Sequence, residues 1–198
     1  MDQDLCARVA DIRRRLDAAA LARWGRAPEI IAVSKTVSAP RINEVKAAGI
    51  ARLGENRVQE LVEKNAAGAY TGAPLHFIGH LQKNKLKYLV GKVDMIESVD
   101  SEELIRLIDK RAQNLGIVQD ILIEVNIGGE ASKSGVKPEE AEALVALAAS
   151  LSGVEPRGLM AIPPVAHEPG ANRSVFAAMH QLFIDIKGKT YDNKVNID

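Results

Sequence analysis

Short apolar runs rich in β-branched residues alternate along the chain with segments in which apolar residues recur at helical spacing. Runs of this length between turn signals are typical of strands, and apolar residues three or four positions apart indicate amphipathic helices. The predicted strands are residues 30–35, 51–55, 75–79, 95–99, 120–126, 157–162 and 195–198. An N-terminal helix, rather than a signal peptide, is predicted from the spacing of Leu5, Val9, Ile12 and Leu16.

The helices predicted between the strands have recognisable ends. Glycine is common just after a helix because it adopts the left-handed conformation readily, and proline suits the first turn because its missing N–H would be unpaired there. From these signals, helices are predicted from Ser38 to Gly49, from Asn56 to Gly68, from Asp100 or Ser101 to Gly116, from Pro138 to Gly153, and over about 173–187. The segment QKNKLKY at 82–88 places Lys83 and Lys87 one helical turn apart, which is typical of a solvated helix face. The chain is therefore predicted to repeat a unit of strand, loop and helix.

This alternation indicates an α/β fold in which helical crossovers join parallel strands. Both a doubly wound sheet and a closed barrel satisfy the pattern. Six complete strand–helix units, without a glycine-rich dinucleotide fingerprint after the first strand, favour a (β/α)8 barrel of the TIM type. The seven predicted strands leave that barrel one strand short. No internal repeat or linker marks a second domain, so residues 1–198 are predicted to form a single domain.

The composition narrows the classes of function. Lys plus Arg and Asp plus Glu both number 26, so no net charge attracts nucleic acid or an anionic membrane surface. The single cysteine, Cys6, cannot form an internal disulfide, and no run approaches the roughly 18 apolar residues of a membrane span. We therefore predict a cytoplasmic protein that binds neither nucleic acid nor membranes.

In both candidate folds, ligands bind at the carboxyl ends of the strands. The residues at these ends are Ser34, Lys35, Glu55, Asn56, Gly79, His80, Ser98, Asn126 and the segment 160–164. Lys35 is the amine among them. From its position alone, Lys35 is most simply a surface lysine whose charge reaches water. The functional interpretation is a partly desolvated lysine that attacks an aldehyde and forms a Schiff base.

Five motifs carry a resemblance to a known family. They are AVSKT at 32–36, GENRVQE at 54–60, HFIGHLQKNK at 76–85, SKSG at 132–135 and RGLMAIP at 157–163. In this order they resemble the signatures of the pyridoxal phosphate homeostasis protein family, also called the YggS or PROSC family, from about residue 5 to residue 198. The resemblance implies a barrel of the alanine racemase N-terminal type that binds pyridoxal 5'-phosphate (PLP). It also implies that Lys35 forms the internal aldimine, that Asn56 lies beside the cofactor ring, and that Met160 belongs to the pocket wall.

The function implied by the resemblance is cofactor homeostasis, in which the protein buffers or delivers PLP through a Lys35 Schiff base without robust catalysis. PLP-dependent apoenzymes are candidate recipients. Because fold and cofactor do not specify a reaction, a PLP-dependent amino-acid racemase or decarboxylase is an alternative. Such enzymes add a second β domain to the same barrel, and 198 residues leave no room for it.

A second alternative is a truncated scaffold that does not bind the cofactor. The family pattern continues beyond Asp198 with a segment containing serine and glycine, and then with an eighth strand carrying an arginine. Those parts normally hold the phosphate and face the pyridine nitrogen. The sequence therefore predicts a barrel from which the last strand or strands are absent. Residues that bind the aldehyde end of the cofactor are present in it, and the residues that bind the phosphate end are not.

Overall fold

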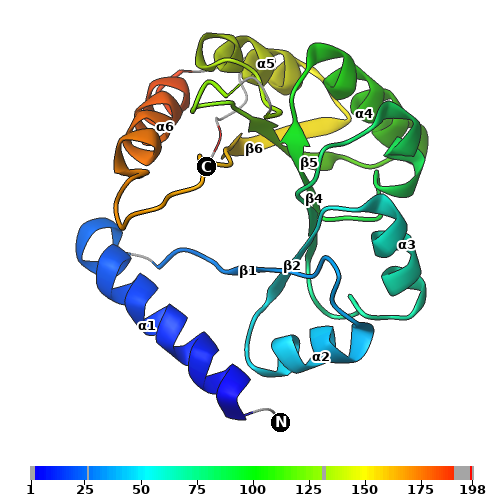
Figure 1. The fold of residues 1–198 in the computed structure, drawn as a ribbon. Helices are drawn as coiled ribbons and strands as arrows, with labels where there is room; N and C mark the ends of the chain where they lie inside the picture. The colour runs from blue at the N-terminus through cyan, green and yellow to red at the C-terminus, as the bar shows by residue number, and fades with distance from the viewer. Residues whose placement is uncertain (1–2, 26, 131–132, 190–196, 198) are drawn as a thin grey trace. The chain divides into compact units, whose positions relative to one another are not determined.

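The computed structural model describes residues 3–25, 27–130, 133–189 and 197 (Figure 1). The chain divides into two compact units, residues 1–76 and 77–198, called unit 1 and unit 2. In both units strands alternate with helices along the chain, as the hydrophobic pattern predicts.

Unit 1 holds the strand that ends near Lys35. Its elements are, in chain order, α1 (Gln3–Trp24), β1 (Ile31–Val33), α2 (Ala39–Ala47), β2 (Arg52–Glu55), α3 (Val58–Ala66) and β3 (Leu75–Phe77), which ends at the division between the units. β1 and β2 are parallel neighbours, joined by α2 as their crossover. Leu53 of β2 and Leu61 of α3 are almost completely buried, so this strand and helix form the core on which the site rests.

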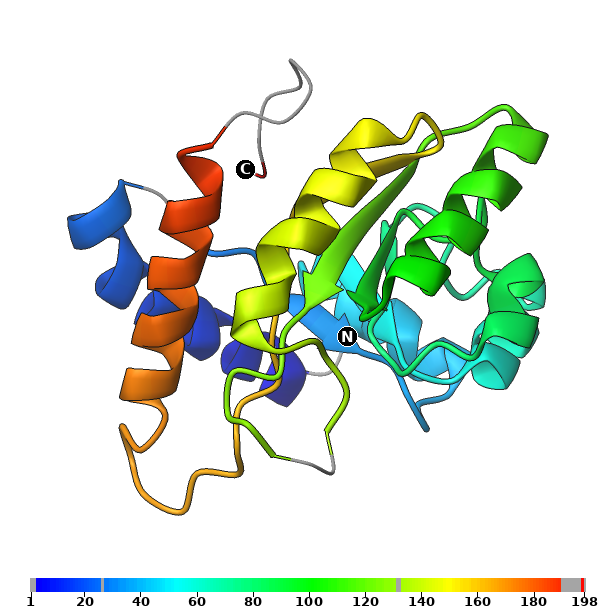
Figure 2. The ribbon, with the colours of Figure 1, turned by 90° about the horizontal axis from the view of Figure 1, so that it is seen from above.

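Unit 2 continues the alternation. Its elements are η1, a 3-10 helix (Lys83–Tyr88), β4 (Met95–Val99), α4 (Glu102–Leu115), β5 (Gln119–Glu124), α5 (Pro138–Ser150), β6 (Val154–Met160) and α6 (Arg173–Lys187). β4, β5 and β6 are successive parallel neighbours. α4 and α5 contact each other and pack along β5 and β6 (Figures 1 and 2). The facing side chains, such as Ile105, Ile121 and Val145, are buried because each helix and each strand presents an apolar side to the other.

The helix ends follow the local chemistry that the sequence indicates. Ser101 caps α4, since its hydroxyl accepts a hydrogen bond from the Leu104 N–H at 3.4 Å. Gly116 ends the same helix in the left-handed conformation, with φ of 65°. Pro138 occupies the first turn of α5, where its missing N–H leaves no donor unpaired.

The predicted elements are largely confirmed, with three differences. β6 begins at Val154 rather than at 157, because Pro156 lies where the β5–β6 register shifts and its missing N–H is tolerated. A 3-10 helix, and not an α-helix, follows β3. α3 begins at Val58 instead of Asn56, because the Glu55 carboxylate binds the two preceding backbone N–H groups. The strand predicted at 195–198 lies, except for residue 197, outside the described residues.

No described helix combines the length and the apolar character needed to cross a membrane.

Candidate functional site

The structure places Lys35 and Asn56 at the same level on two neighbouring strands. In the β1–β2 pairing Ile31 lies opposite Arg52 and Val33 lies opposite Gly54, a constant offset of 21 residues. Continued by two residues beyond the last pair, the same offset sets Lys35 beside Asn56. The ladder extends this far, since the Ser34 N–H donates to the Gly54 carbonyl at 2.7 Å. Two of the three predicted cofactor-binding residues are therefore brought together.

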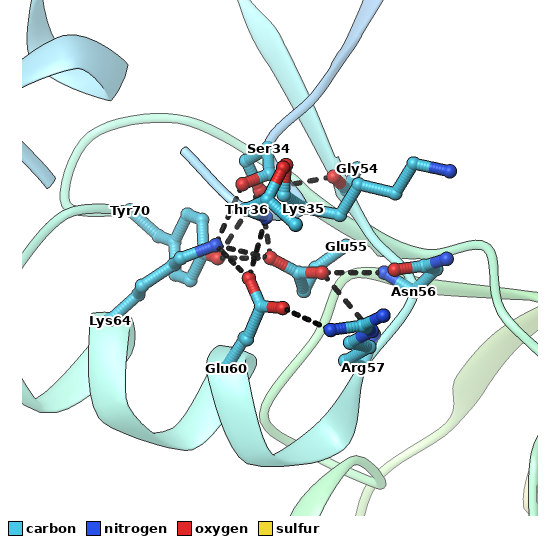
Figure 3. A network of polar contacts seen from close by, with 10 residues as sticks. All are labelled: Ser34, Lys35, Thr36, Gly54, Glu55, Asn56, Arg57, Glu60, Lys64 and Tyr70. Carbon is cyan, nitrogen blue, oxygen red and sulfur yellow. Dashed lines mark hydrogen bonds and ion pairs between the residues drawn. The ribbon is translucent and has the colours of Figure 1, made fainter. Parts of the chain in front are cut away.

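Successive side chains of a strand point to opposite faces, so this register also separates two kinds of chemistry. Ser34 and Glu55 point to the buried face, where they are 3% and 0% exposed. Lys35 and Asn56 follow on the other face, and Lys35 is exposed. Figure 3 shows the Lys35 side chain extending away from the buried polar groups.

Five residues form a polar cluster on the buried face, called here the strand-end cluster: Ser34, Glu55, Glu60, Lys64 and Tyr70 (Figure 3). Glu55 is at its centre. One carboxylate oxygen, Oε1, accepts hydrogen bonds from the backbone N–H groups of Asn56 at 2.8 Å and Arg57 at 3.2 Å. The other, Oε2, accepts from Lys64 Nζ at 2.8 Å and from the Tyr70 hydroxyl at 3.3 Å. A buried carboxylate is tolerated only with such pairing.

Lys64 links the two strand ends to α3. Its amine donates to Glu55 Oε2 at 2.8 Å, to Glu60 Oε2 at 2.7 Å and to the Ser34 carbonyl at 2.7 Å, so all three N–H groups have acceptors. Burial alone would lower the pKa of Lys64, but the hydrogen bonds to Glu55 and Glu60 outweigh it and raise that pKa. The side chain, only 12% exposed, is therefore a buried cation.

Two further pKa shifts fix the protonation states of the cluster. The hydrogen bond from Lys64, followed by that from the Thr36 N–H, lowers the pKa of Glu60, which is therefore a carboxylate at neutral pH. Burial is the main cause that raises the pKa of Tyr70 to about 12. The phenol stays protonated at neutral pH and serves as a hydrogen-bond donor.

The face of β1 and β2 opposite the strand-end cluster carries two groups that fit an aldehyde cofactor. Among the described residues, the Lys35 amine makes no hydrogen bond and no ion pair, although the sequence led us to expect a partly desolvated position for it. On the adjacent strand, the side-chain oxygen Oδ1 of Asn56 is buried and has no hydrogen-bond partner within the described part of the chain. An unpaired buried acceptor costs free energy unless a ligand supplies the missing donor. A free amine beside such an acceptor suits PLP.

Met160, the third predicted residue, lies in unit 2 at the end of β6. Its carbonyl accepts a hydrogen bond from the Val125 N–H at 2.8 Å, and its side chain is half-buried. It therefore lies at the carboxyl end of a strand, as predicted. Elsewhere in this unit, His80 Nδ1 lies 3.3 Å from the Ser134 hydroxyl. The described residues include no group of His, Cys, Asp or Glu that could hold a metal ion.

Sequence reasoning missed the roles of three members of the strand-end cluster, Glu60, Lys64 and Tyr70. None of them ends a strand, and the predicted candidates were strand-end residues. One signal was available for Lys64, because Glu60 precedes it by four residues, the spacing of an ion pair on a helix. No local pattern connects Tyr70 to Glu55, since they meet only through the fold of unit 1.

Comparison with known proteins shows which family and which relatives the chain resembles. The family described as "Alanine racemase, N-terminal domain" matches residues 9–196. A "Pyridoxal phosphate homeostasis protein" from Aquifex aeolicus is 41% identical over 179 residues, which cover 89% of this chain and 78% of the relative. The protein of the same name from Escherichia coli K12 is 40% identical over 168 residues, covering 81% of this chain and 70% of the relative.

The solved structures that resemble the chain include the following two. PipY from Synechococcus elongatus with PLP bound has a TM-score of 0.78 and 29% identity, over 93% of this chain and 82% of its own. An alanine racemase from Clostridium difficile has a TM-score of 0.70 with 16% identity, over 86% of this chain and 46% of its own, and shows a shared fold alone.

The fold, with Lys35 and Asn56 at the ends of neighbouring strands, thus defines an α/β protein with the parallel strands of the alanine racemase N-terminal barrel. This confirms the predicted fold class. Within that class, the chain belongs to the pyridoxal phosphate homeostasis protein family, as its motifs predict.

Proposed function

We propose that this protein binds PLP in cofactor homeostasis, holding it on Lys35 so that it can be buffered or delivered. One observation carries the proposal: the free Lys35 amine lies at a strand end beside Asn56, whose buried side-chain oxygen has no partner among the described residues. Curated relatives named for PLP homeostasis, and PipY with PLP bound, support it.

Each predicted residue has a distinct role in this proposal. PLP supplies an aldehyde, with which an unprotonated lysine amine condenses with loss of water. Lys35 provides that amine from a strand end. Asn56 provides a polar contact beside the ring, and Met160 provides part of the apolar wall. The strand-end cluster fixes the backbone on both sides of Lys35 and Asn56, which preorganises the site.

We further propose that the protein holds the cofactor without robust turnover. Two members of the strand-end cluster that could exchange protons, Glu55 and Tyr70, lie on the buried face, opposite Lys35 and Asn56, and are hydrogen-bonded to each other. Tyr70, with a pKa of about 12, also stays protonated at neutral pH. General acid–base catalysis requires such a group within reach of the reacting atoms.

Residues 1–198 act as one PLP-binding domain in this proposal, in keeping with the single family match over 9–196. A cytoplasmic location is proposed from the lone cysteine, Cys6, which is free. PLP-dependent apoenzymes are the proposed recipients of the cofactor, because a reversible bond to Lys35 allows the aldehyde to be released to another lysine.

The proposed function predicts where PLP attaches. Added PLP should give the yellow absorbance of a lysine-bound cofactor, and borohydride reduction should fix the label on Lys35. Peptide mapping by mass spectrometry is the measurement, with the cluster of Lys83, Lys85 and Lys87 as an internal comparison because these lysines follow one another on a surface 3-10 helix. A label spread over these three lysines, with Lys35 unmodified, would contradict the proposed site.

The proposal also predicts the absence of enzymatic turnover. The PLP-loaded protein should not racemise, transaminate or decarboxylate common amino acids at the roughly 1 per second or faster that is usual for enzymes. Chiral chromatography and product assays at neutral pH measure this, with an authentic alanine racemase as positive control. Turnover at that rate that disappears in Lys35→Ala would make the protein an enzyme and reverse the proposal.

A further inference from the structure

Lys35 lies in a tight turn with an unusual backbone. The Val37 N–H donates to the Ser34 carbonyl at 3.0 Å and closes a four-residue turn over residues 34–37, called here the Lys35 turn. Thr36, its third residue, has φ of 61°, and among the described residues it is the one non-glycine with positive φ. A turn with positive φ at this position is of the type II kind and normally carries glycine there. A β-branched threonine is strained in this conformation.

Helix α3 contacts the Lys35 turn at two points, on either side of Lys35 (Figure 3). Glu60 Oε2 accepts a hydrogen bond from the Thr36 N–H at 2.7 Å. One helical turn later, Lys64 Nζ donates to the Ser34 carbonyl at 2.7 Å. The two side chains are also paired with each other at 2.7 Å, so they act as one clamp.

The hydrogen bond to Glu60 offsets the strain at Thr36. A carboxylate bound to a backbone N–H forms a charge-assisted hydrogen bond, which is stronger than a neutral one. Strained backbone persists only where surrounding contacts hold it, and strained residues cluster at functional sites. Without Glu60, Thr36 is free to relax to negative φ, which would turn the preceding Cα–Cβ bond of Lys35 in a new direction.

We propose that Glu60 is a positioning residue that holds Thr36 in the left-handed conformation and so aims the Lys35 amine at the aldehyde of PLP. This inference rests on the proposed function. Glu60 suits the role better than its neighbours in the cluster. Its removal leaves the buried pair of Glu55 and Lys64 intact, so the core of unit 1 keeps its charge balance.

The test compares Glu60→Ala with a matched control on the same helix, Glu63→Ala. Glu63 is exposed, and its carboxylate accepts a hydrogen bond only from the Gln59 side chain among the described residues. Glu60→Ala should weaken PLP binding about tenfold, the equivalent of about 1.4 kcal/mol, whereas Glu63→Ala should leave it unchanged. Glu60→Gln keeps an acceptor for the Thr36 N–H and should stay within about threefold of the wild type.

A rescue experiment separates positioning from general destabilisation. Glycine adopts positive φ without strain, so Thr36→Gly combined with Glu60→Ala should recover binding to within about threefold of the wild type. Thr36→Asn serves as a second rescue variant, because asparagine tolerates the left-handed conformation and adds less backbone freedom than glycine. Failure of both rescues would overturn the inference.

Amide hydrogen exchange on the PLP-free protein gives a second readout that needs no cofactor. The Thr36 amide should exchange at least about tenfold faster in Glu60→Ala, while the Leu61 amide in α3 stays protected. Unchanged exchange at Thr36 would overturn the inference even if PLP binding were normal. Conversely, a wild-type protein that takes up no PLP on Lys35 would overturn the proposed function, while exchange at Thr36 would still show whether Glu60 holds the turn.

Discussion

Replacing Lys35 with alanine should abolish the lysine-bound absorbance of added PLP and weaken its retention at least about 100-fold, the equivalent of about 2.7 kcal/mol. The reason is that the covalent bond to the aldehyde has no substitute, since Asn56 on the adjacent strand carries no nucleophile. The fold itself should be unaffected. Lys35 is exposed and makes no ion pair with the described residues, so the free energy of unfolding should change by no more than about 0.5 kcal/mol.

Two control variants distinguish chemistry from charge. Lys35→Arg keeps the positive charge but removes the nucleophilic amine, so it should lose the label as completely as Lys35→Ala. Lys92→Ala removes an exposed lysine of unit 2 and should label like the wild type. The measurements are absorbance titration and mass spectrometry after reduction. Retention of the label in Lys35→Ala, or normal PLP affinity in Lys35→Arg, would show that Lys35 does not hold the cofactor.

Lys64→Met should destabilise the protein by roughly 3 to 5 kcal/mol, the cost of breaking a buried ion pair by removing one partner. The methionine leaves the fully buried Glu55 carboxylate beside an apolar group, and the hydrogen bond that Lys64 donates to the Ser34 carbonyl is also lost. Urea denaturation followed by circular dichroism measures the loss. Lys92→Met is the matched control, because the same substitution at an exposed position should cost less than about 0.5 kcal/mol.

A double variant tests whether the uncompensated charge is the cause. Glu55→Gln combined with Lys64→Met leaves no buried charge on this pair and keeps an oxygen to accept the N–H groups of Asn56 and Arg57. It should therefore recover part of the lost stability. A Lys64→Met protein within about 1 kcal/mol of the wild type would contradict the buried ion pair.

The titration of Glu60 predicts how the stability of Lys64→Met, relative to the wild type, depends on pH. Because Lys64 lowers the pKa of Glu60 from its ordinary value of 4.5, the ionised pair stabilises the folded state above that pH, and the stabilisation is lost as the pH falls through the folded-state pKa. The wild type should therefore lose stability in acid more steeply than Lys64→Met, so that the difference between them narrows below about pH 4. A difference that stayed constant from pH 7 to pH 3 would argue against this coupling.

The strands and the chemistry at their ends were predictable from the sequence because both are local properties. Apolar runs of the right length fix where a strand lies, and the residue after the run marks its end. Lys35 and Asn56 were found in this way, and the register of β1 and β2 sets them side by side. Met160 was found at the end of β6 by the same rule, although the proline before it concealed where that strand begins.

The contacts that join the strand-end residues to Lys64 and Tyr70, and the conformation of Thr36, were decided by the tertiary structure. Ser34 and Tyr70 are 36 residues apart, and Lys64 reaches back 30 residues to the Ser34 carbonyl. Such contacts form only when a helix packs against the strand ends, and no pattern in the sequence encodes their distances. Thr36 likewise has no local reason to adopt positive φ, since threonine disfavours it. The sequence by itself determined which amine is presented, and packing of α3 determined the backbone that presents it.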